Sequence, residues 1–268
     1  MTPRKFREQV LAYYAVQGRD ELPWRKTRDP YCILVSEIML QQTQVERVVP
    51  YYQTFIERFP TTAALSEAPL SDVLRLWQGL GYNRRAKYLK EAAQAIHQKH
   101  NGVFPKTTKE LEALPGIGPY TAAAVCAFAY NLDVVCVETN IRTAVLAHFF
   151  KDREQVSDKE ILAVLEKALP HGDARTWYAA LMDYGTHLKR TGTSLNAKSK
   201  SYTKQKPFKG SAREVRGAIL RALAETKKTE STLRKLFPER MDDIVAQLHV
   251  LQEEGLIKKT KQTYSLAD

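Results

Sequence analysis

Glu37 is an acidic residue within a stretch of mostly apolar residues. It lies in the segment Tyr31 to Gln42, which has the spacing of a helix, and it shares a helical face with apolar side chains. Loss of hydration there raises the pKa of a carboxyl group and allows it to donate a proton near neutral pH. The alternative is a structural glutamate paired with a cation, for which Arg25 is the candidate.

A second carboxylate, Glu138, follows an apolar run and directly precedes a predicted helix that starts at Asn140. A carboxylate at this point can stabilise an oxocarbenium-like sugar, as paired carboxylates do in glycoside hydrolysis. It can equally be an acid at a helix N-terminus, where the helix dipole favours it. The spacing leaves both interpretations open.

The segment from Leu114 to Thr121 reads Leu-Pro-Gly-Ile-Gly-Pro-Tyr-Thr and separates two helical stretches. Gly116 and Gly118 allow a turn in which a Cβ would clash, and Pro119 suits the first turn of a helix. Backbone N–H groups at such a turn can hold a phosphate. The pattern predicts a helix-hairpin-helix and fits this better than an ordinary tight turn.

The elements that position these residues are predicted to be helices, so the fold class is mainly α. Hydrophobic periodicity and the Pro, Gly and Thr breaks indicate the ends of each helix. The expected helices are 3–17, 31–42, 45–59, 71–78, 84–99, 119–129, 140–149, 157–169 and 174–188.

The chain is expected to have three parts. Residues 1–188 form the helical domain, and residues 189–210 form a basic linker that includes Lys198 and Lys200. A solvated tether without a specific role is the alternative for the linker. Residues 211–268 are predicted to form a small α+β domain that resembles a winged helix, with helices at 211–225, 231–237 and 239–254 and a hairpin at 256–266.

The charge of the chain favours a polyanionic partner. The formal net charge is +11, and residues 191–268 contain 16 Lys and Arg against 9 Asp and Glu. No apolar run has the length of a membrane span, so we expect no membrane and a cytoplasmic location. The three cysteines are scattered, which argues against disulfides, a zinc site or an iron–sulfur cluster. The six histidines show no spacing typical of metal ligands.

Several separate motifs, in this order, resemble those of the MutY-type adenine DNA glycosylases of the helix-hairpin-helix (HhH-GPD) superfamily. The resemblance spans about residues 20–188. The motifs are Leu22-Pro23-Trp24-Arg25, the run from Ser36 to Val45, Trp77-Gln78-Gly79-Leu80-Gly81-Tyr82 and Leu114-Pro115-Gly116-Ile117-Gly118. The resemblance implies a two-lobed glycosylase domain that removes adenine paired with 8-oxoguanine or guanine in double-stranded DNA, as in base excision repair.

The same resemblance implies roles for single residues. Glu37 corresponds to the acid that protonates the adenine ring, and Tyr120 and Asn140 to polar groups around the sugar. Gln42 and Tyr82 correspond to side chains that wedge into the duplex where the base leaves. Tyr120 stands where lyase-active relatives have a Schiff-base lysine, which implies a monofunctional enzyme without strong lyase activity. The remaining candidate DNA contacts are Arg25, Gln41, Leu114, Gly116, Gly118, Lys198 and Lys200.

The sequence departs from this family at three points. Glu138 replaces the catalytic aspartate and is one methylene longer. The four cysteines that ligate a [4Fe–4S] cluster are absent, and residues 188–209 stand in their place, so no cofactor is expected. The predicted winged helix replaces the usual C-terminal domain, which leaves the opposite base open.

The alternatives are a thymine or uracil glycosylase acting at G:T or G:U mismatches and a non-catalytic lesion-binding protein. Gln41-Gln42-Thr43 favours the adenine enzyme. A nucleoid-associated monomer is expected.

Overall fold

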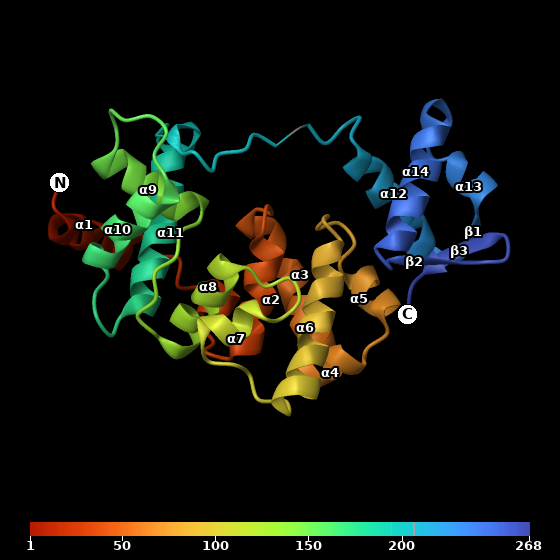
Figure 1. Cartoon of the computed structure of the whole chain (residues 1–268), viewed down its shortest axis with the longest axis horizontal. Helices are drawn as coiled ribbons and strands as arrows, with labels where there is room; N and C mark the ends of the chain where they lie inside the picture. Colours follow the sequence, from red (N-terminus) through yellow and green to blue (C-terminus); the bar gives the residue numbers. More distant parts are fainter. Residues whose placement is uncertain (194, 206) are drawn as a thin grey trace. The chain divides into compact units, whose positions relative to one another are not determined.

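The computed structural model describes residues 1–193, 195–205 and 207–268, and helices form most of it (Figure 1). The mainly α class is confirmed. The helices of the first 190 residues are α1 (Pro3–Gln17), α2 (Pro30–Leu40), α3 (Val45–Arg58), α4 (Thr62–Glu67), α5 (Leu70–Leu76), α6 (Arg84–His100), α7 (Thr108–Glu112), α8 (Pro119–Tyr130), α9 (Thr139–Phe149), α10 (Asp158–Ala168) and α11 (Ala174–Arg190).

Each helix expected from periodicity in this region is present, with ends within about two residues of the prediction. The sequence analysis missed α4 and α7, which have six and five residues and are too short to show a periodic pattern. Side-chain caps explain several starts. Thr107 before α7 and Ser157 before α10 each form a capping box with the glutamate three residues later.

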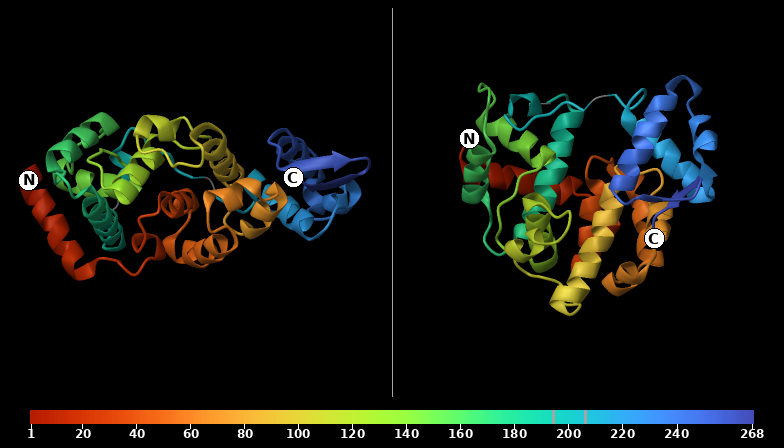
Figure 2. Two further views of the ribbon diagram at one scale, coloured as in Figure 1. Left: turned by 90° about the horizontal axis from the view of Figure 1, so that it is seen from below. Right: turned by 45° about the vertical axis from the view of Figure 1, so that its right-hand side comes forward.

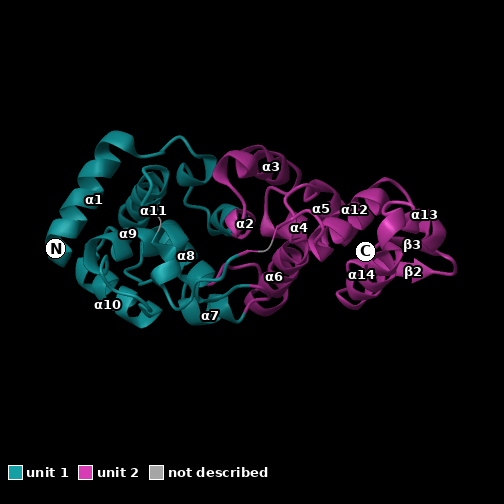
Figure 3. Ribbon diagram, turned by 90° about the horizontal axis from the view of Figure 1, so that it is seen from above, with its two compact units in different colours: residues 1–37, 106–113, 117–204 teal, residues 38–105, 114–116, 205–268 magenta. Residues whose placement is uncertain are grey.

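The chain forms two compact units, each built from separate stretches of sequence (Figure 3). Unit 1 comprises residues 1–37, 106–113 and 117–204, and unit 2 comprises residues 38–105, 114–116 and 205–268. These units cross the boundaries that we expected at 188 and 210.

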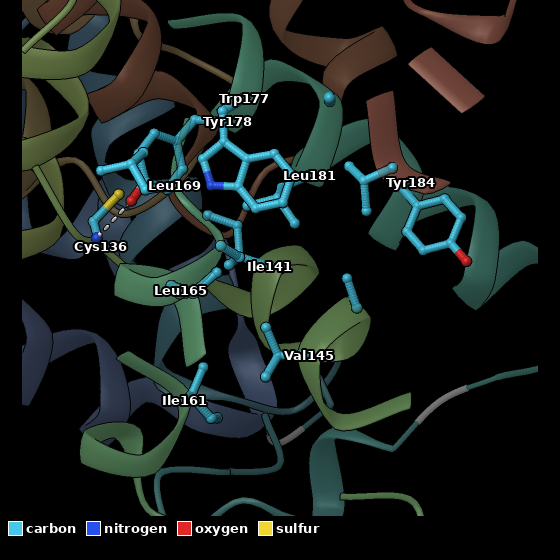
Figure 4. Packing of buried hydrophobic residues seen from close by; sticks show 14 of the residues in the cluster. Cys136, Ile141, Val145, Ile161, Leu165, Leu169, Trp177, Tyr178, Leu181 and Tyr184 are labelled. Atoms are coloured by element: carbon cyan, nitrogen blue, oxygen red, sulfur yellow. Dashed lines mark hydrogen bonds between the residues drawn. The ribbon is translucent and has the colours of Figure 1, made fainter. Parts of the chain in front are cut away.

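The core of unit 1 lies where α1, α9, α10 and α11 pack together. Trp177 and Tyr178 of α11 are fully buried against Ile141 and Val145 of α9, as Figure 4 shows. The Tyr178 hydroxyl accepts the N–H of Cys136 at 3.2 Å, which fixes the chain that leads into α9.

One glycine allows α11 to lie very close to α9. A Cβ on Gly185 would be 2.1 Å from the carbonyl oxygen of Asn140, a distance that packed atoms do not adopt. The close approach brings the last turn of α11 beside the start of α9.

The C-terminal part of unit 2 is the predicted winged-helix-like arrangement (blue in Figure 2). It contains α12 (Ala212–Glu225), α13 (Glu230–Arg234) and α14 (Met241–Glu253), followed by the hairpin of β2 (Ile257–Thr260) and β3 (Thr263–Leu266). The unexpected strand β1 (Lys228–Thr229) pairs with β3, which gives an antiparallel sheet in the order β1-β3-β2.

The alternative of a solvated tether is wrong for residues 195–201, which pack within unit 1. Val156 donates its N–H to the carbonyl of Lys198 and accepts the N–H of Lys200, at 2.9 and 3.0 Å. Asn196 is buried and contacts Thr143 of α9 at 3.2 Å. Backbone pairing and a buried amide therefore fix this stretch despite its polar composition. Ser194 and Lys206 of the linker lie outside the described residues.

Within the described ranges, no helix combines the length and the apolar character needed to cross a membrane.

Candidate active site

Glu37 lies near the end of α2 and is 6% exposed. Its Oε2 accepts a hydrogen bond from the Tyr120 hydroxyl at 2.9 Å. Burial raises the pKa of Glu37 to about 7, because a buried carboxylate loses its hydration; the hydrogen bond from Tyr120 lowers this pKa, and the charge of Glu138 raises it. The side chain is thus suited to donate a proton near neutral pH, as its apolar setting predicted.

Tyr120 is the second residue of α8, directly after the hairpin. Burial raises the pKa of its phenol far above the ordinary value, and the nearby carboxylates Glu37 and Glu138 act in the same direction. The hydroxyl therefore stays protonated and donates to Glu37. The sequence analysis did not predict this contact between Tyr120 and Glu37.

The interpretation of Arg25 as the cation paired with Glu37 is wrong. Arg25 forms a two-pronged ion pair with Asp183 of α11, with N–O distances of 2.5 and 2.8 Å. Asp183 also accepts the backbone N–H of Arg19 at 2.9 Å. The Arg25 side chain is 10% exposed, so we assign it to the framework of unit 1 and not to a DNA-contacting surface.

Glu138 is the N-cap residue of α9. Its Oε1 accepts the backbone N–H groups of Asn140 and Ile141 at 2.7 and 2.8 Å. Loss of hydration raises the pKa of Glu138 above its ordinary value, although these two N–H groups and the charges of Lys189 and Arg142 act in the opposite direction. Glu138 therefore has the role at the helix N-terminus that the sequence left open. The same contacts fix the orientation of its carboxylate.

Lys189 completes this site, and the sequence analysis missed its role there. Its Nζ donates to Oδ1 of Asn140 at 2.7 Å, and Nδ2 of Asn140 lies 3.3 Å from Oε2 of Glu138. An ammonium group offers only donors, so Lys189 orients the Asn140 amide with its oxygen toward Lys189 and its NH₂ toward Glu138. The sequence signal that could have indicated this role is the position of Lys189 at the start of the segment that stands in place of the cluster cysteines.

The hairpin has the predicted form. Gly116 has φ of 72°, and a Cβ there would be 2.4 Å from Cβ of Tyr88. Gly118 is the N-cap of α8, no side chain caps that helix, and a Cβ on Gly118 would meet open space. The start of α8 therefore lies next to a glycine without a side chain, an arrangement typical of phosphate-binding helix N-termini. Leu114 is 3% exposed and belongs to the core, so only its backbone can contact DNA.

The two loops that carry Gln42 and Tyr82 are joined by the buried side chain of Arg85 in unit 2. Its guanidinium donates to the carbonyls of Ile38 and Met39 at the end of α2 and of Gln41 in the loop that follows. It also donates to the carbonyls of Leu80 and Gly81 in the other loop, and all these distances are 2.6–3.2 Å. Gln42 and Tyr82 have positive φ values of 57° and 48°, which non-glycine residues rarely adopt. The motifs indicated the loops, but not the arginine that organises them.

The candidate linker contacts differ from each other. Lys198 forms an ion pair with Glu154 at 2.7 Å, which makes its ammonium group less available to bind a phosphate. Lys200 is exposed. The cysteines do not fit an iron–sulfur cluster, because Cys32, Cys126 and Cys136 lie in unit 1 before α9 and none follows. Among the residues the structure describes, no group of three His, Cys, Asp or Glu side chains could hold a metal ion.

Unit 1 therefore contains two buried carboxyl groups with raised pKa values, those of Glu37 and Glu138, and Tyr120, Asn140 and Lys189 provide their polar contacts. A pair in which one carboxyl donates a proton and the other carries negative charge is the arrangement that cleaves glycosidic bonds.

The chain is similar to known DNA repair proteins. Residues 35–171, half of the chain, match the family described as HhH-GPD superfamily base excision DNA repair protein. The adenine DNA glycosylase of Buchnera aphidicola subsp. Baizongia pistaciae is 37% identical over 215 residues, which cover 78% of this chain and 61% of that protein. That of Mycolicibacterium smegmatis is 43% identical over 180 residues, covering 66% of this chain and 61% of that protein.

A solved structure, described as a thermostable thymine-DNA glycosylase, has a TM-score of 0.60 and 29% identity, and the match covers 68% of this chain and 86% of that one. The chain spans about three fifths of the length of the two curated relatives. The family match includes Glu37, the hairpin and Glu138. This chain belongs to the HhH-GPD superfamily of base excision DNA repair proteins.

Proposed function

We propose that the protein is a monofunctional DNA glycosylase that extrudes adenine opposite 8-oxoguanine or guanine and hydrolyses its bond to the sugar. The observation that carries the proposal is Glu37, a buried carboxyl whose pKa is raised to about 7 beside the Glu138 carboxylate. The relatives named adenine DNA glycosylase, at 37% and 43% identity, support adenine as the base.

The proposed reaction assigns separate roles to the two carboxyl groups. Glu37 donates its proton to a ring nitrogen of the base, which turns the base into a better leaving group. As the bond between the base and the sugar breaks, the sugar acquires positive charge, and Glu138 stabilises it. Asn140 and Lys189 hold Glu138 in place, and water then adds to the sugar.

The proposal includes double-stranded DNA with a mismatched or oxidised pair as the partner, a monomer, a nucleoid-associated location and no cofactor. The glycine hairpin before α8 and the net charge of +11 suit a DNA backbone. The absence of any cysteine after Cys136 supports folding without an iron–sulfur cluster. Iron and visible absorbance in the purified protein would contradict this part.

The Glu37→Gln variant tests the central role. We expect it to slow adenine release from an adenine:8-oxoguanine duplex by a factor of about 100 to 10,000, because it removes the proton donor and keeps the shape. Binding to the same duplex should change little. Single-turnover base release, followed by alkali cleavage, measures the rate, with Glu67→Gln on the exposed side of α4 as the control. A variant with the rate of the wild type would remove Glu37 from the chemistry.

Thymine opposite guanine is the second candidate substrate, favoured by the 29% identity to the thymine-DNA glycosylase structure. The same assay on adenine:8-oxoguanine, adenine:guanine, guanine:thymine and guanine:uracil duplexes separates the two. Adenine release alone supports the main proposal, and thymine or uracil release supports the second. Tight binding without any release would identify a non-catalytic lesion-binding protein.

A further inference from the structure

Arg142 lies one helical turn after Glu138, and its backbone N–H donates to the Glu138 carbonyl at 2.8 Å. Side chains four residues apart on a helix are neighbours, and an acid that precedes a base at this spacing is in the favourable order for an ion pair. Local spacing therefore favours contact between the Arg142 guanidinium and the Glu138 carboxylate. The structure instead pairs this guanidinium with Asp158, the first residue of α10.

Asp158 contacts Arg142 through both carboxylate oxygens. Nε and Nη2 of Arg142 donate to Oδ1 at 3.2 and 3.0 Å, and Nη2 also donates to Oδ2 at 3.0 Å. The Arg142 side chain is largely buried, whereas that of Asp158 is 34% exposed. Because a guanidinium is planar and rigid, contacts with two oxygens fix its plane as well as its position. Asp158 therefore decides where the charge of Arg142 lies.

The segment 195–201 also holds Asp158. The Ser201 hydroxyl donates to Oδ2 of Asp158 at 2.9 Å. Ser201 directly follows Lys200, whose backbone N–H donates to the Val156 carbonyl at 3.0 Å, so the backbone next to Ser201 is fixed. The Asp158 carboxylate is thus held by α9 through Arg142 and by this segment through Ser201.

The two carboxylate oxygens of Glu138 have different contacts. Oε1 accepts the backbone N–H groups of Asn140 and Ile141 at 2.7 and 2.8 Å. Oε2 is 3.3 Å from Nδ2 of Asn140, which makes a longer and weaker hydrogen bond. A carboxylate oxygen can accept two hydrogen bonds, so Oε2 keeps the capacity to face the positive charge that develops on the sugar. A guanidinium bound to Oε2 would neutralise that oxygen and occupy its place.

We propose that Asp158 is a positioning residue for base release, because it holds the Arg142 guanidinium away from the Glu138 carboxylate and so leaves Oε2 of Glu138 for the sugar. The inference rests on the proposed function, in which Glu138 stabilises the sugar. Asp158 acts through Arg142 and not on the reacting atoms. Arg142 then affects Glu138 through its charge at a distance, and not by occupying the carboxylate.

The ionisation of Glu138 responds to the charged groups around it. Burial raises its pKa, whereas the charges of Lys189 and Arg142 lower it. The other titratable groups that interact with its charge are the carboxyl of Glu37, the phenol of Tyr120 and the thiol of Cys136. The acidic limb of the pH–rate profile reports the Glu138 proton, so changes at Arg142 and Asp158 should move that limb.

The variants Asp158→Asn and Arg142→Gln test the proposal with opposite effects on this profile. Asp158→Asn leaves the Arg142 guanidinium without its carboxylate, so that it pairs with Glu138. We expect the maximal rate of base release to fall about tenfold. The acidic limb should move to lower pH by about one unit, because a contacting cation favours the ionised carboxylate. Arg142→Gln removes the cation, and its acidic limb should move to higher pH.

The double variant Asp158→Asn/Arg142→Gln separates positioning from a structural role. It lacks the guanidinium that Asp158→Asn sets free, so it should be faster than Asp158→Asn and should have the acidic limb of Arg142→Gln. Two losses that only weaken the fold would add, and the double variant would then be at most as fast as Asp158→Asn. That outcome would overturn the proposal.

Single-turnover release of adenine from an adenine:8-oxoguanine duplex, with enzyme in excess, gives the rate at each pH. Glu154→Gln is the matched control, because it breaks the ion pair between Glu154 and Lys198 and leaves Asp158 unchanged, and it should keep the wild-type profile. Thermal unfolding shows which variants fold. Should Asp158→Asn not fold, Ser201→Ala loosens Asp158 and keeps every charge, and its acidic limb should move in the same direction by less. An acidic limb that stays in place would contradict the proposal.

Carbon-13 NMR of the Glu138 side-chain carboxyl tests the same contact without catalysis, and its signal is identified by its absence in Glu138→Gln. We expect the pKa of Glu138 to be lower than in the wild type in Asp158→Asn and higher in Arg142→Gln. Equal pKa values in Asp158→Asn and the wild type would overturn the proposal whatever base the enzyme removes. Failure of the proposed function is separate, since the wild type would then release no adenine while these pKa differences persist.

Discussion

At the scale of single residues, the site depends on two glutamates held by different means. Burial favours the neutral form of Glu37, against the effect of the hydrogen bond from the Tyr120 phenol. Glu138 accepts two backbone N–H groups and lies near two cations, contacts that favour its ionised form against the loss of hydration. The two carboxyl groups thus differ in their contacts, although burial raises the pKa of both.

The raised pKa of Glu37 makes the stability of the protein depend on pH. The folded protein keeps this proton up to a pH of about 7, whereas an unfolded glutamate loses it near 4.5, so the free energy of unfolding falls as pH rises through that window. Glu37→Gln removes the effect. We expect it to be more stable than the wild type by about 3 kcal/mol at pH 8, and close to it at pH 4. Urea unfolding at both pH values measures this difference, and an equal difference at both would contradict it.

We predict that base release requires glutamate, and not the shorter aspartate, at position 138. Glu138→Asp should still cap α9, because aspartate is a good N-cap residue. The carboxylate would then lie about 1 Å away from its present place, and we expect roughly 10-fold to 100-fold slower base release. Glu138→Gln keeps the size and loses the charge, and should also be slow. Single-turnover rates of the three proteins decide, and a faster aspartate variant would refute the adapted site.

Lys189 is predicted to act through Glu138 and Asn140 as a positioning residue. Its charge lowers the pKa of Glu138, so Lys189→Gln should raise that pKa and move the acidic limb of the pH–rate profile of base release to higher pH. The basic limb, which reports the loss of the Glu37 proton, should stay near 7. Lys189→Arg should restore the acidic limb. A uniform loss of rate at every pH, without rescue, would indicate a merely structural role.

At the scale of elements, the approach of α11 to α9 places Lys189 beside Asn140, and Gly185 makes that approach possible. A Cβ at Gly185 would clash with the Asn140 backbone at 2.1 Å. We expect Gly185→Ala to reduce the free energy of unfolding by about 1–3 kcal/mol and to slow base release. Gly217→Ala is the control, because a helical glycine in open space should gain about 0.5–1 kcal/mol from the same change. Urea unfolding of the two variants compares them, and equal effects would remove the packing argument.

At the scale of the whole molecule, the basic linker is predicted to add affinity for DNA without reading sequence. Replacing Lys198, Lys200, Lys204 and Lys206 with alanine should weaken binding to paired and mismatched duplexes alike and flatten the dependence on salt. Lys198 should contribute least, because it is paired with Glu154. Anisotropy titrations at several salt concentrations measure both effects. Selective loss of mismatch binding would show that the linker reads the lesion.

Local patterns in the sequence predicted most elements and the buried setting of Glu37. Helices with several turns can be predicted from hydrophobic periodicity, and the hairpin from its two glycines. Both predictions are possible because backbone geometry and amphipathic burial depend on neighbouring residues. The apolar setting of Glu37 likewise follows from residues three and four positions away. The winged-helix-like fold of residues 211–268 could be predicted for the same reason, apart from the two-residue strand β1.

Only the tertiary structure decided which distant side chains meet. Asp183 takes the guanidinium of Arg25, Lys189 reaches Asn140, and Arg85 joins two loops, over separations of 158, 49 and up to 47 residues. The polar segment 195–201 reads as a tether, yet backbone pairing with Val156 holds it on unit 1. Such contacts depend on how helices pack and where chain segments dock, and this is a property of the assembled core that no local window of sequence contains.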